Sequence, residues 1–158
     1  MEASAGLAQV TFRGATRDDV PALADMIASE NLPPFFIEEF LDGFLIAERG
    51  GAMLACGGVE SYGDCAVLRS IVVAPEARGL GLGRDIGDRL ITVGRERGAR
   101  HLYLFTMDAW AFWKRLGFED VGLDEWHEPA RACWQWQYIS QNREHEMFRG
   151  IHSMWKAA

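Results

Sequence analysis

Two stretches of the chain carry hydrophobic residues at helical spacing, separated by polar positions. The first is capped by Thr16 or Asp18 and ends at Asn31, just before a pair of prolines. In the second, the apolar positions over Leu82–Val93 step by four, four and three residues, and Gly98 follows them. Both stretches therefore predict amphipathic helices with one buried face. Shorter helical segments are predicted at Phe35–Asp42 and Ala109–Gly117.

Segments rich in apolar and β-branched residues lie between these helices and predict strands. A short strand is expected at Ala8–Phe12, and a hairpin joins Phe44–Glu48 to Ala52–Glu60 through an Arg-Gly-Gly turn. Cys65–Val73 is almost continuously apolar, which is typical of a central strand covered on both faces, and His101–Phe105 has the same character. The order strand, glycine-rich turn, helix, strand and helix predicts an α/β (α+β) fold with a mixed central sheet.

The last part of the chain is rich in tryptophan. Trp134, Trp136 and Tyr138 alternate onto one face, which predicts a strand, and the apolar positions over Met147–Trp155 predict a terminal helix. We therefore expect one domain, with a core at residues 1–123 and a strand and helix at 124–158 that complete it or form a dimer interface. Because an apolar stripe on a terminal helix needs burial, a homodimer is expected.

Composition narrows the class of protein. Hydrophobic residues make up 49% of the 158 residues, and 16 Lys and Arg against 23 Asp and Glu give a net charge of −7. This charge argues against binding to nucleic acid or to a membrane, and the amino end lacks the pattern of a signal peptide. Three cysteines without ligand spacing and four scattered histidines predict no metal site and a reducing, cytoplasmic location.

The glycine-rich turn before the second long helix is the most informative motif. Its sequence is V-A-P-E-A-R-G-L-G-L-G-R, with three glycines at alternate positions between a buried strand and a helix. Exposed N–H groups at the helix start, together with Arg78 and Arg84, predict a phosphate or pyrophosphate site. The alternative is a turn in which the glycines only relieve strain. Neither the GxGxxG pattern of dinucleotide sites nor the GxxxxGK[ST] pattern of ATP-binding loops is present.

The motif R-x-x-G-x-G at Arg78, Gly81 and Gly83 resembles that of the GNAT acyltransferases. The resemblance covers Val10–Val121 and includes LRSIVVAPEARGLGLGRDIGDRLITVGRERGARHLYLFT, followed by AWAFWKRLGF. The upstream region resembles the branch of small-molecule N-acetyltransferases associated with arsenic resistance, which is related to N-acetylglutamate synthase domains.

This resemblance implies a GNAT fold with splayed central strands, helices on both faces of the sheet, and acetyl-CoA as cosubstrate without a metal. The pantetheine arm of acetyl-CoA would pair with the backbone of Ile71, Val72 and Val73, and the N–H of Val73 would donate to the thioester carbonyl. The pyrophosphate would lie beside Arg78 on the amides of Gly79, Leu80, Gly81, Leu82, Gly83 and Arg84.

The family pattern breaks at the expected acid and base. Many members protonate the leaving thiolate with a tyrosine, but the corresponding position here is Trp113, which packs beside the sulfur or is a core aromatic residue. No glutamate lies in the strand at His101–Phe105, so Glu60 or Asp64 would accept the proton of the amine, unless each is a solvated charge at a strand end.

Two further residues are candidates for the acceptor site. Arg69 interrupts an apolar strand and needs an anionic partner, either a substrate carboxylate or a carboxylate of the chain itself. Thr106 follows a buried strand and either lines the same crevice or caps the next helix.

The sequence thus predicts an enzyme, an acetyl-CoA-dependent N-acetyltransferase that acts on a small, amino-acid-like amine by direct attack on the thioester. One alternative is an enzyme that acetylates proteins or peptides. Another is a noncatalytic acyl-CoA-binding sensor, for which missing acid and base residues would be typical.

Overall fold

The computed structural model describes residues 9–158, whose strands are hydrogen-bonded in the order β1-β2-β3-β4-β5-β7-β6. The strands are β1 (Thr11–Gly14), β2 (Phe44–Arg49), β3 (Ala52–Tyr62), β4 (Cys65–Val73), β5 (His101–Thr106), β6 (Glu119–Asp120) and β7 (His152–Ala157). The α-helices are α2 (Val20–Ser29), α3 (Leu82–Glu96), α4 (Trp110–Arg115) and α5 (Trp134–Gln141). The sheet is mixed, because β4 and β5 are parallel whereas β2 pairs with β1 and β3, and β7 with β5 and β6, in antiparallel register.

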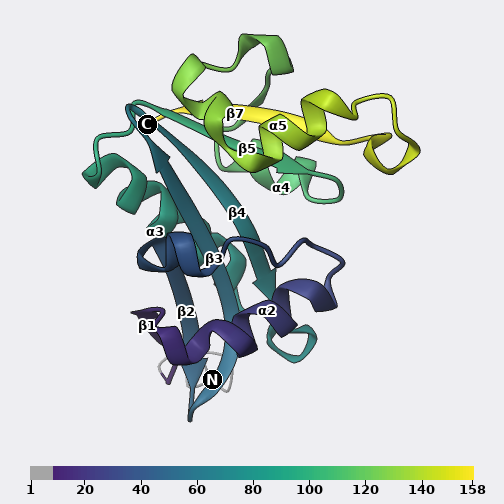
Figure 1. The fold of residues 1–158 in the computed structure, drawn as a ribbon. Helices are drawn as coiled ribbons and strands as arrows, with labels where there is room; N and C mark the ends of the chain where they lie inside the picture. The colour runs from purple at the N-terminus through teal and green to yellow at the C-terminus, as the bar shows by residue number, and fades with distance from the viewer. Residues whose placement is uncertain (1–8) are drawn as a thin grey trace. The chain divides into compact units, whose positions relative to one another are not determined.

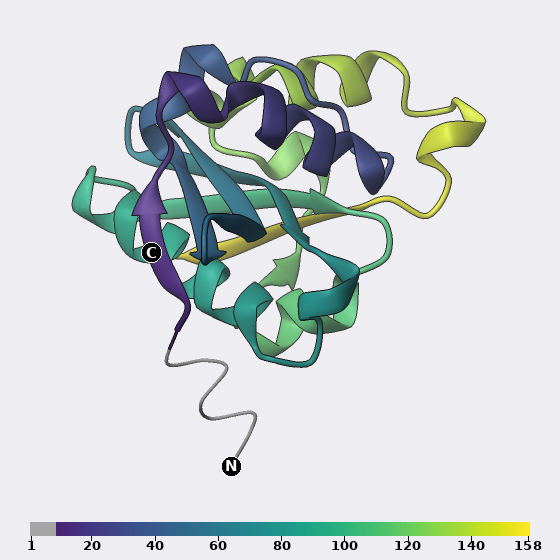
Figure 2. The same ribbon diagram turned by 90° about the horizontal axis from the view of Figure 1, so that it is seen from below.

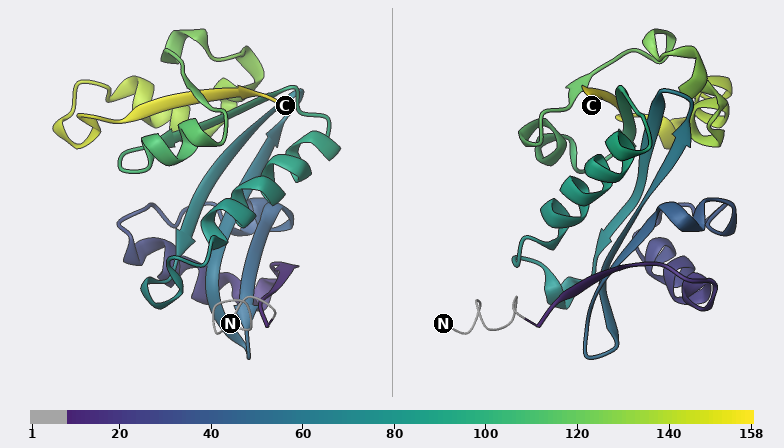
Figure 3. Two further views of the ribbon diagram at one scale, coloured as in Figure 1. Left: turned by 180° about the vertical axis from the view of Figure 1, so that it is seen from behind. Right: turned by 90° about the vertical axis from the view of Figure 1, so that its left-hand side faces the viewer.

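The chain divides into two compact units, residues 9–59 with 70–93 and residues 60–69 with 94–158. In the first unit, α2 and α3 lie on opposite faces of β2 and β3 (Figures 1 and 3). Seven buried residues form the core on the α2 side, and all but one are large apolar side chains. They are Leu23, Ile27, Ile37, Phe44, Ile46, Cys56 and Val72.

A glycine in β3 lets α3 approach the sheet closely. A Cβ atom at Gly57 would lie 2.7 Å from Cγ2 of Ile86 and 2.8 Å from Cδ1 of Leu90. Both of these residues are fully buried on the apolar face of α3. The predicted helical stripe thus packs where β3 has no side chain, which fixes the helix and the turn before it.

In the second unit, β5 and β7 lie side by side, with α4 on one face and α5 on the other (Figure 2). The parallel register of β4 and β5 covers the first three residues of each strand, Cys65–Val67 against His101–Tyr103. The core on the α5 side consists of Cys65, Val67, Tyr103, Trp126, Ala130 and Cys133. Trp126 is 1% exposed and stacks on Tyr103 and Phe105, with ring centroids 4.4 and 4.8 Å apart.

Most of the elements predicted before Val121 are found, with three differences. The strand expected at Ala8–Phe12 is β1 at Thr11–Gly14, and Ala8 lies outside the described residues. The helical segment expected at Phe35–Asp42 is a 3-10 helix, η2 (Glu38–Gly43).

The third difference lies at the start of α2. Thr16 precedes a short 3-10 turn, η1 (Arg17–Asp19), and its N–H and hydroxyl donate to Oδ2 of Asp19 at 2.7 and 3.1 Å. The helix itself follows Asp19, so the alternative cap at Asp18 is wrong. Asp19 takes this position because Arg13 also binds its carboxylate, at 2.7 and 2.8 Å.

Both predictions for the tail are wrong. The tryptophan segment forms the helix α5, and the terminal segment forms the strand β7, preceded by the 3-10 turn η6 (Glu146–Phe148). Met154 is buried in β7 opposite Leu104 of β5, so its apolar side chain is covered by the chain itself. The terminal helix whose apolar stripe predicted a homodimer is therefore absent from the structure. In residues 9–158 no helix has the length and apolar character needed to cross a membrane.

Candidate functional site

The glycine-rich turn connects the end of β4 to α3 in the first unit. Gly79 and Gly81 have φ angles of 85° and 80°, and a Cβ atom at either position would meet nothing within 4 Å. The backbone conformation itself therefore requires glycine, because other residues rarely adopt positive φ. The space above the turn is open, so a ligand can approach its main chain.

The amides at the start of α3 are oriented to bind an anion. The N–H of Asp85 donates to the carbonyl of Gly81 at 3.1 Å, which is the first hydrogen bond of the helix. The N–H groups of Leu82, Gly83 and Arg84 precede it and have no acceptor within the helix. With the positive end of the helix dipole, these donors make a site suited to phosphate.

Two exposed arginines flank the turn, and each contacts an acidic residue of the same unit. Nη2 of Arg78 lies 2.6 Å from Oε1 of Glu30, and its Nε donates to the carbonyl of Val73 at 3.4 Å. Nε of Arg84 lies 3.9 Å from Oδ2 of Asp88, one turn further along α3. Because surface ion pairs are weak, both guanidinium groups can turn toward a phosphate.

The end of β4 carries a backbone feature that the sequence does not reveal. Ser70 has a φ of 58° within an otherwise extended strand. A positive φ in a non-glycine residue is uncommon, and such strain is found preferentially at functional sites. The residues that follow, Ile71, Val72 and Val73, are those expected to pair with the pantetheine arm. Serine has no special preference for this conformation, so nothing in the sequence predicts it.

Glu60 and Arg69 form a buried ion pair in the second unit. Their side chains are 0% and 2% exposed, and Nη1 of Arg69 lies 3.0 Å from Oε2 of Glu60. The hydroxyl of Tyr62 donates to Oε1 of the same carboxylate at 2.5 Å, and burial together with this hydrogen bond raises the pKa of Tyr62. Arg69 also lies over the ring of Trp134 in α5. The structure thus places two predicted site residues in contact, with Glu60 as an anionic partner of Arg69.

Trp113 and Thr106 lie on or next to α4. Trp113 is 5% exposed, and its ring meets Phe112 and Phe118 edge to face at 5.0 and 5.4 Å between centroids. This is the environment of a core aromatic residue. The hydroxyl oxygen of Thr106 accepts from the N–H of Ala109 at 3.0 Å, just before α4 begins. Trp113 thus makes the contacts of a core aromatic residue, and Thr106 makes the contact expected of a residue that caps the next helix.

The three cysteines are buried thiols. Burial raises the pKa of Cys133 to about 12, and burial together with the nearby charge of Asp64 raises the pKa of Cys65 to about 11. Because the thiolate is the nucleophile, such groups stay inert near neutral pH. None of them is therefore a candidate for a covalent nucleophile.

The fold also brings together three potential metal ligands that are far apart in the sequence. Asp64, His101 and His127 each offer an atom within 4.8 Å of the others. However, the indole N–H of Trp155 donates to Nδ1 of His101 at 3.2 Å, so neutral His101 carries its proton on Nε2. Coordination through Nε2 would require the loss of that hydrogen bond. We therefore assign no metal to this group.

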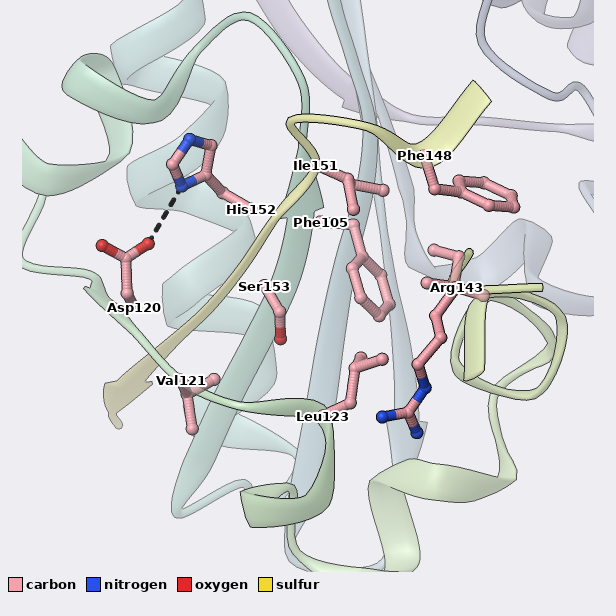
Figure 4. Close-up of a pocket in the computed structure, with 10 residues that line it drawn as sticks. Phe105, Asp120, Val121, Leu123, Arg143, Phe148, Ile151, His152 and Ser153 are labelled. Atoms are coloured by element: carbon pink, nitrogen blue, oxygen red, sulfur yellow. Dashed lines mark hydrogen bonds and ion pairs between the residues drawn. The ribbon is translucent and has the colours of Figure 1, made fainter. Parts of the chain in front are cut away.

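A cavity of about 290 Å³ lies at the carboxyl end of β5 in the second unit (Figure 4). Its lining residues are mostly apolar, with one arginine and a few other polar groups. They are Phe105, Asp120, Val121, Leu123, Ile139, Arg143, Phe148, Ile151, His152 and Ser153. Most of these residues belong to the tail, whose secondary structure the sequence pattern did not predict, so sequence reasoning missed the cavity.

Comparison with protein families identifies one match. Residues 15–118 match the model of the Acetyltransferase (GNAT) family, which is about two-thirds of the chain and includes β4, the glycine-rich turn and α3. The matched residues end before the tail.

Curated relatives of the chain include amino-acid acetyltransferases. That of Mycobacterium tuberculosis is 27% identical over 121 residues, which are 69% of this chain and 68% of the relative. That of Ectopseudomonas mendocina is 24% identical over 140 residues, which are 83% of this chain but 32% of the relative. The chain thus spans about a third of the longer relatives.

Solved structures share the fold. A Mycobacterium tuberculosis protein in complex with CoA superposes with a TM-score of 0.74 at 22% identity and covers 94% of this chain and 99% of its own. N-acetylglutamate synthase of Neisseria gonorrhoeae, complexed with coenzyme A and N-acetyl-glutamate, has a TM-score of 0.76 at 21% identity. It covers 94% of this chain and 35% of its own.

Proposed function

The chain belongs to the GNAT acetyltransferase family, and on this premise we propose that it transfers the acetyl group of acetyl-CoA to the amine of a small, amino-acid-like acceptor. The observation that carries the proposal is the turn before α3, where Gly79 and Gly81 adopt positive φ and the amides of Leu82, Gly83 and Arg84 have no acceptor within the helix. This arrangement suits the pyrophosphate of acetyl-CoA. The names of the amino-acid acetyltransferase relatives support an amino acid as acceptor.

The reaction is a direct attack. The amine nitrogen bonds to the thioester carbon, the carbon–sulfur bond breaks, and coenzyme A leaves as a thiol after taking up a proton. The N–H of Val73 donates to the thioester oxygen and stabilises the oxyanion as it forms. Arg78 and Arg84 bind the phosphates from the two sides of the turn.

No side chain of residues 9–158 is assigned as general base or general acid in this proposal. Both oxygens of Glu60 already accept hydrogen bonds, from Tyr62 and Arg69, so Glu60 keeps its partners in position instead of taking the amine proton. Trp113 packs in the core, and its indole is a poor proton source. Water therefore carries the proton from the ammonium and the proton to the leaving thiolate.

The test combines two measurements on the whole chain. Isothermal titration with acetyl-CoA measures binding, and a thiol reagent measures coenzyme A release with free amino acids, polyamines, aminoglycosides and peptides. We expect binding, together with release that depends on free amino acids. Release with peptides alone would instead indicate a protein or peptide acetyltransferase. Binding without release on any amine would indicate an acyl-CoA-binding sensor, the alternative that the occupied carboxylate of Glu60 favours.

A further inference from the structure

We propose that the cavity at the carboxyl end of β5 receives the apolar side chain of an α-amino acid, whose carboxylate pairs with Arg143. This inference rests on the proposed acetyl transfer and adds the class of acceptor. The carboxyl ends of strands in an open α/β sheet are where ligands commonly bind. The cavity lies there, next to the last residues of β5 and the first residues of β7, which pair with each other.

The walls of the cavity are apolar. Figure 4 shows the side chains of Phe105, Leu123 and Ile151 facing the same space. Ile139 of α5 and Phe148 of η6 complete this surface. The volume of about 290 Å³ is at the lower limit of typical small-molecule sites, which begin at about 300 Å³. A single aliphatic or aromatic side chain is the kind of group that such a cavity holds.

The polar groups are few and lie where they can orient a ligand. Figure 4 shows the guanidinium of Arg143 beside Leu123, whereas the ring of His152 is directed toward Asp120. Burial works against the charge of Asp120, but hydrogen bonds from Trp110 and His152 outweigh it and lower the pKa of that carboxyl. Asp120 and His152 therefore interact with each other and with Trp110.

Arg143 is a cationic residue of the lining that a ligand can reach. Its side chain is 51% exposed, and Nη2 lies 3.6 Å from Oδ1 of Asp124, whose side chain is 83% exposed. Its Nε donates to the carbonyl of Ser140 at 3.4 Å. Both contacts are long, so a ligand carboxylate can replace or join them as a two-pronged partner of the guanidinium.

Ser153 supplies one further polar atom. Its Oγ accepts the indole N–H of Trp126 at 2.6 Å, so its own proton remains a donor. This hydroxyl and Arg143 are both donors, which suits the carboxylate of an amino acid. An acidic side chain is a poor fit, because a carboxylate buried among Phe105, Ile139 and Ile151 would lack a cationic partner.

The experiment compares four amines as acceptors: L-phenylalanine, L-leucine, L-glutamate and 2-phenylethylamine. The last is phenylalanine without its carboxylate. Coenzyme A release gives kcat/KM for each amine. Direct binding of N-acetyl-L-phenylalanine and N-acetyl-L-glutamate to the protein is measured by isothermal titration, which does not depend on turnover. We expect both apolar amino acids to exceed L-glutamate by about tenfold or more, and N-acetyl-L-phenylalanine to bind more tightly.

Two variants test the two ends of the cavity. Arg143→Gln should lower kcat/KM for L-phenylalanine by about tenfold and leave 2-phenylethylamine unchanged. The matched control is Arg149→Gln, which removes an exposed arginine of the same segment that does not line the cavity. Ile151→Trp should fill the cavity and weaken both substrates. Its control is Met147→Trp, at an exposed position outside the lining.

The results separate this inference from the proposed function. If amines are acetylated but L-glutamate is preferred, or if Arg143→Gln affects L-phenylalanine and 2-phenylethylamine equally, the cavity inference is wrong and acetyl transfer stands. If no amine is acetylated, the proposed function is wrong. In that case, binding of N-acetyl-L-phenylalanine still tests the cavity inference. Tight binding that Arg143→Gln weakens would support a site for an apolar amino acid, and a lack of binding would overturn it.

Discussion

The pattern of apolar and polar residues predicts the secondary structure of the segment from β4 to α3 correctly, but not that of the tail beyond Asp124. In the first, the predicted strand, glycine-rich turn and helix are all confirmed, over Cys65–Val73 and Leu82–Glu96. In the second, helix and strand are exchanged: the alternating aromatic residues form α5 and the apparent helical stripe forms β7. The difference lies in where the stabilising contacts come from.

Local chemistry dictates the first segment. The strand is apolar except at Arg69 and Ser70, Pro75 follows it closely, and two glycines adopt the positive φ that the turn needs. In the tail, by contrast, distant partners decide the structure. The indole of Trp136 in α5 donates to the carbonyl of Leu123, thirteen residues earlier. β7 forms because β5 offers an edge for pairing along His101–Thr106.

Arg69→Met should have the largest effect on stability, because it leaves the buried charge of Glu60 unpaired. Breaking a buried ion pair from one side costs about 3–5 kcal/mol. We expect a loss of this size in the free energy of unfolding, measured by urea denaturation. The double variant Glu60→Met with Arg69→Met should recover part of it. A stable Arg69→Met protein with a raised KM for acidic acceptors alone would instead show that Arg69 binds the substrate.

Arg69 also marks the limit of what the sequence could predict. A charged residue in a buried strand predicts an anionic partner, but two partners were equally consistent with the sequence. The choice of Glu60 depends on a contact across nine residues that forms only when β3 and β4 fold together.

The phosphate-binding turn was predictable because its residues are contiguous. The cavity lining, by contrast, combines residues of β5, α5 and β7, so no local pattern encodes it.

Gly81→Val should abolish acetyl-CoA binding, with a loss of affinity of about hundredfold or more, because a branched side chain blocks the main chain of the turn. The cost in folding stability should be about 1–3 kcal/mol, from the positive φ. Gly98→Val is the matched control, since Gly98 also has a positive φ and open space around it but lies after α3. Isothermal titration with acetyl-CoA measures the affinity of both variants. Equal losses of affinity in the two variants would contradict the proposed phosphate site at the turn before α3.

Trp126→Phe should cost less, because the aromatic stack with Tyr103 and Phe105 is largely kept. The change removes the hydrogen bond to Ser153 and some buried surface, which together predict a loss of about 1–2 kcal/mol in the free energy of unfolding. Trp110→Phe, at a half-buried position on α4, should change it by under about 1 kcal/mol. If both variants lose the same amount, the tail does not depend on the stack around Trp126.

The smallest effect concerns the buried thiols and pH. The pKa of Cys133 is raised to about 12, against about 8.5 in an unfolded chain. Because the folded state favours the neutral thiol, this stabilisation is complete below about pH 8.5 and is lost as the pH rises toward 12. At pH 9 the free energy of unfolding of the wild type should be lower than at pH 7 by under about 1 kcal/mol, and that of Cys133→Ala should fall by less.

A thiol reagent at pH 8 should find Cys56, Cys65 and Cys133 unreactive in the native protein and reactive in denaturant. Rapid reaction of Cys133 in the native state would mean that α5, which begins directly after it, opens readily, and that the tail is held less firmly than the segment around α3.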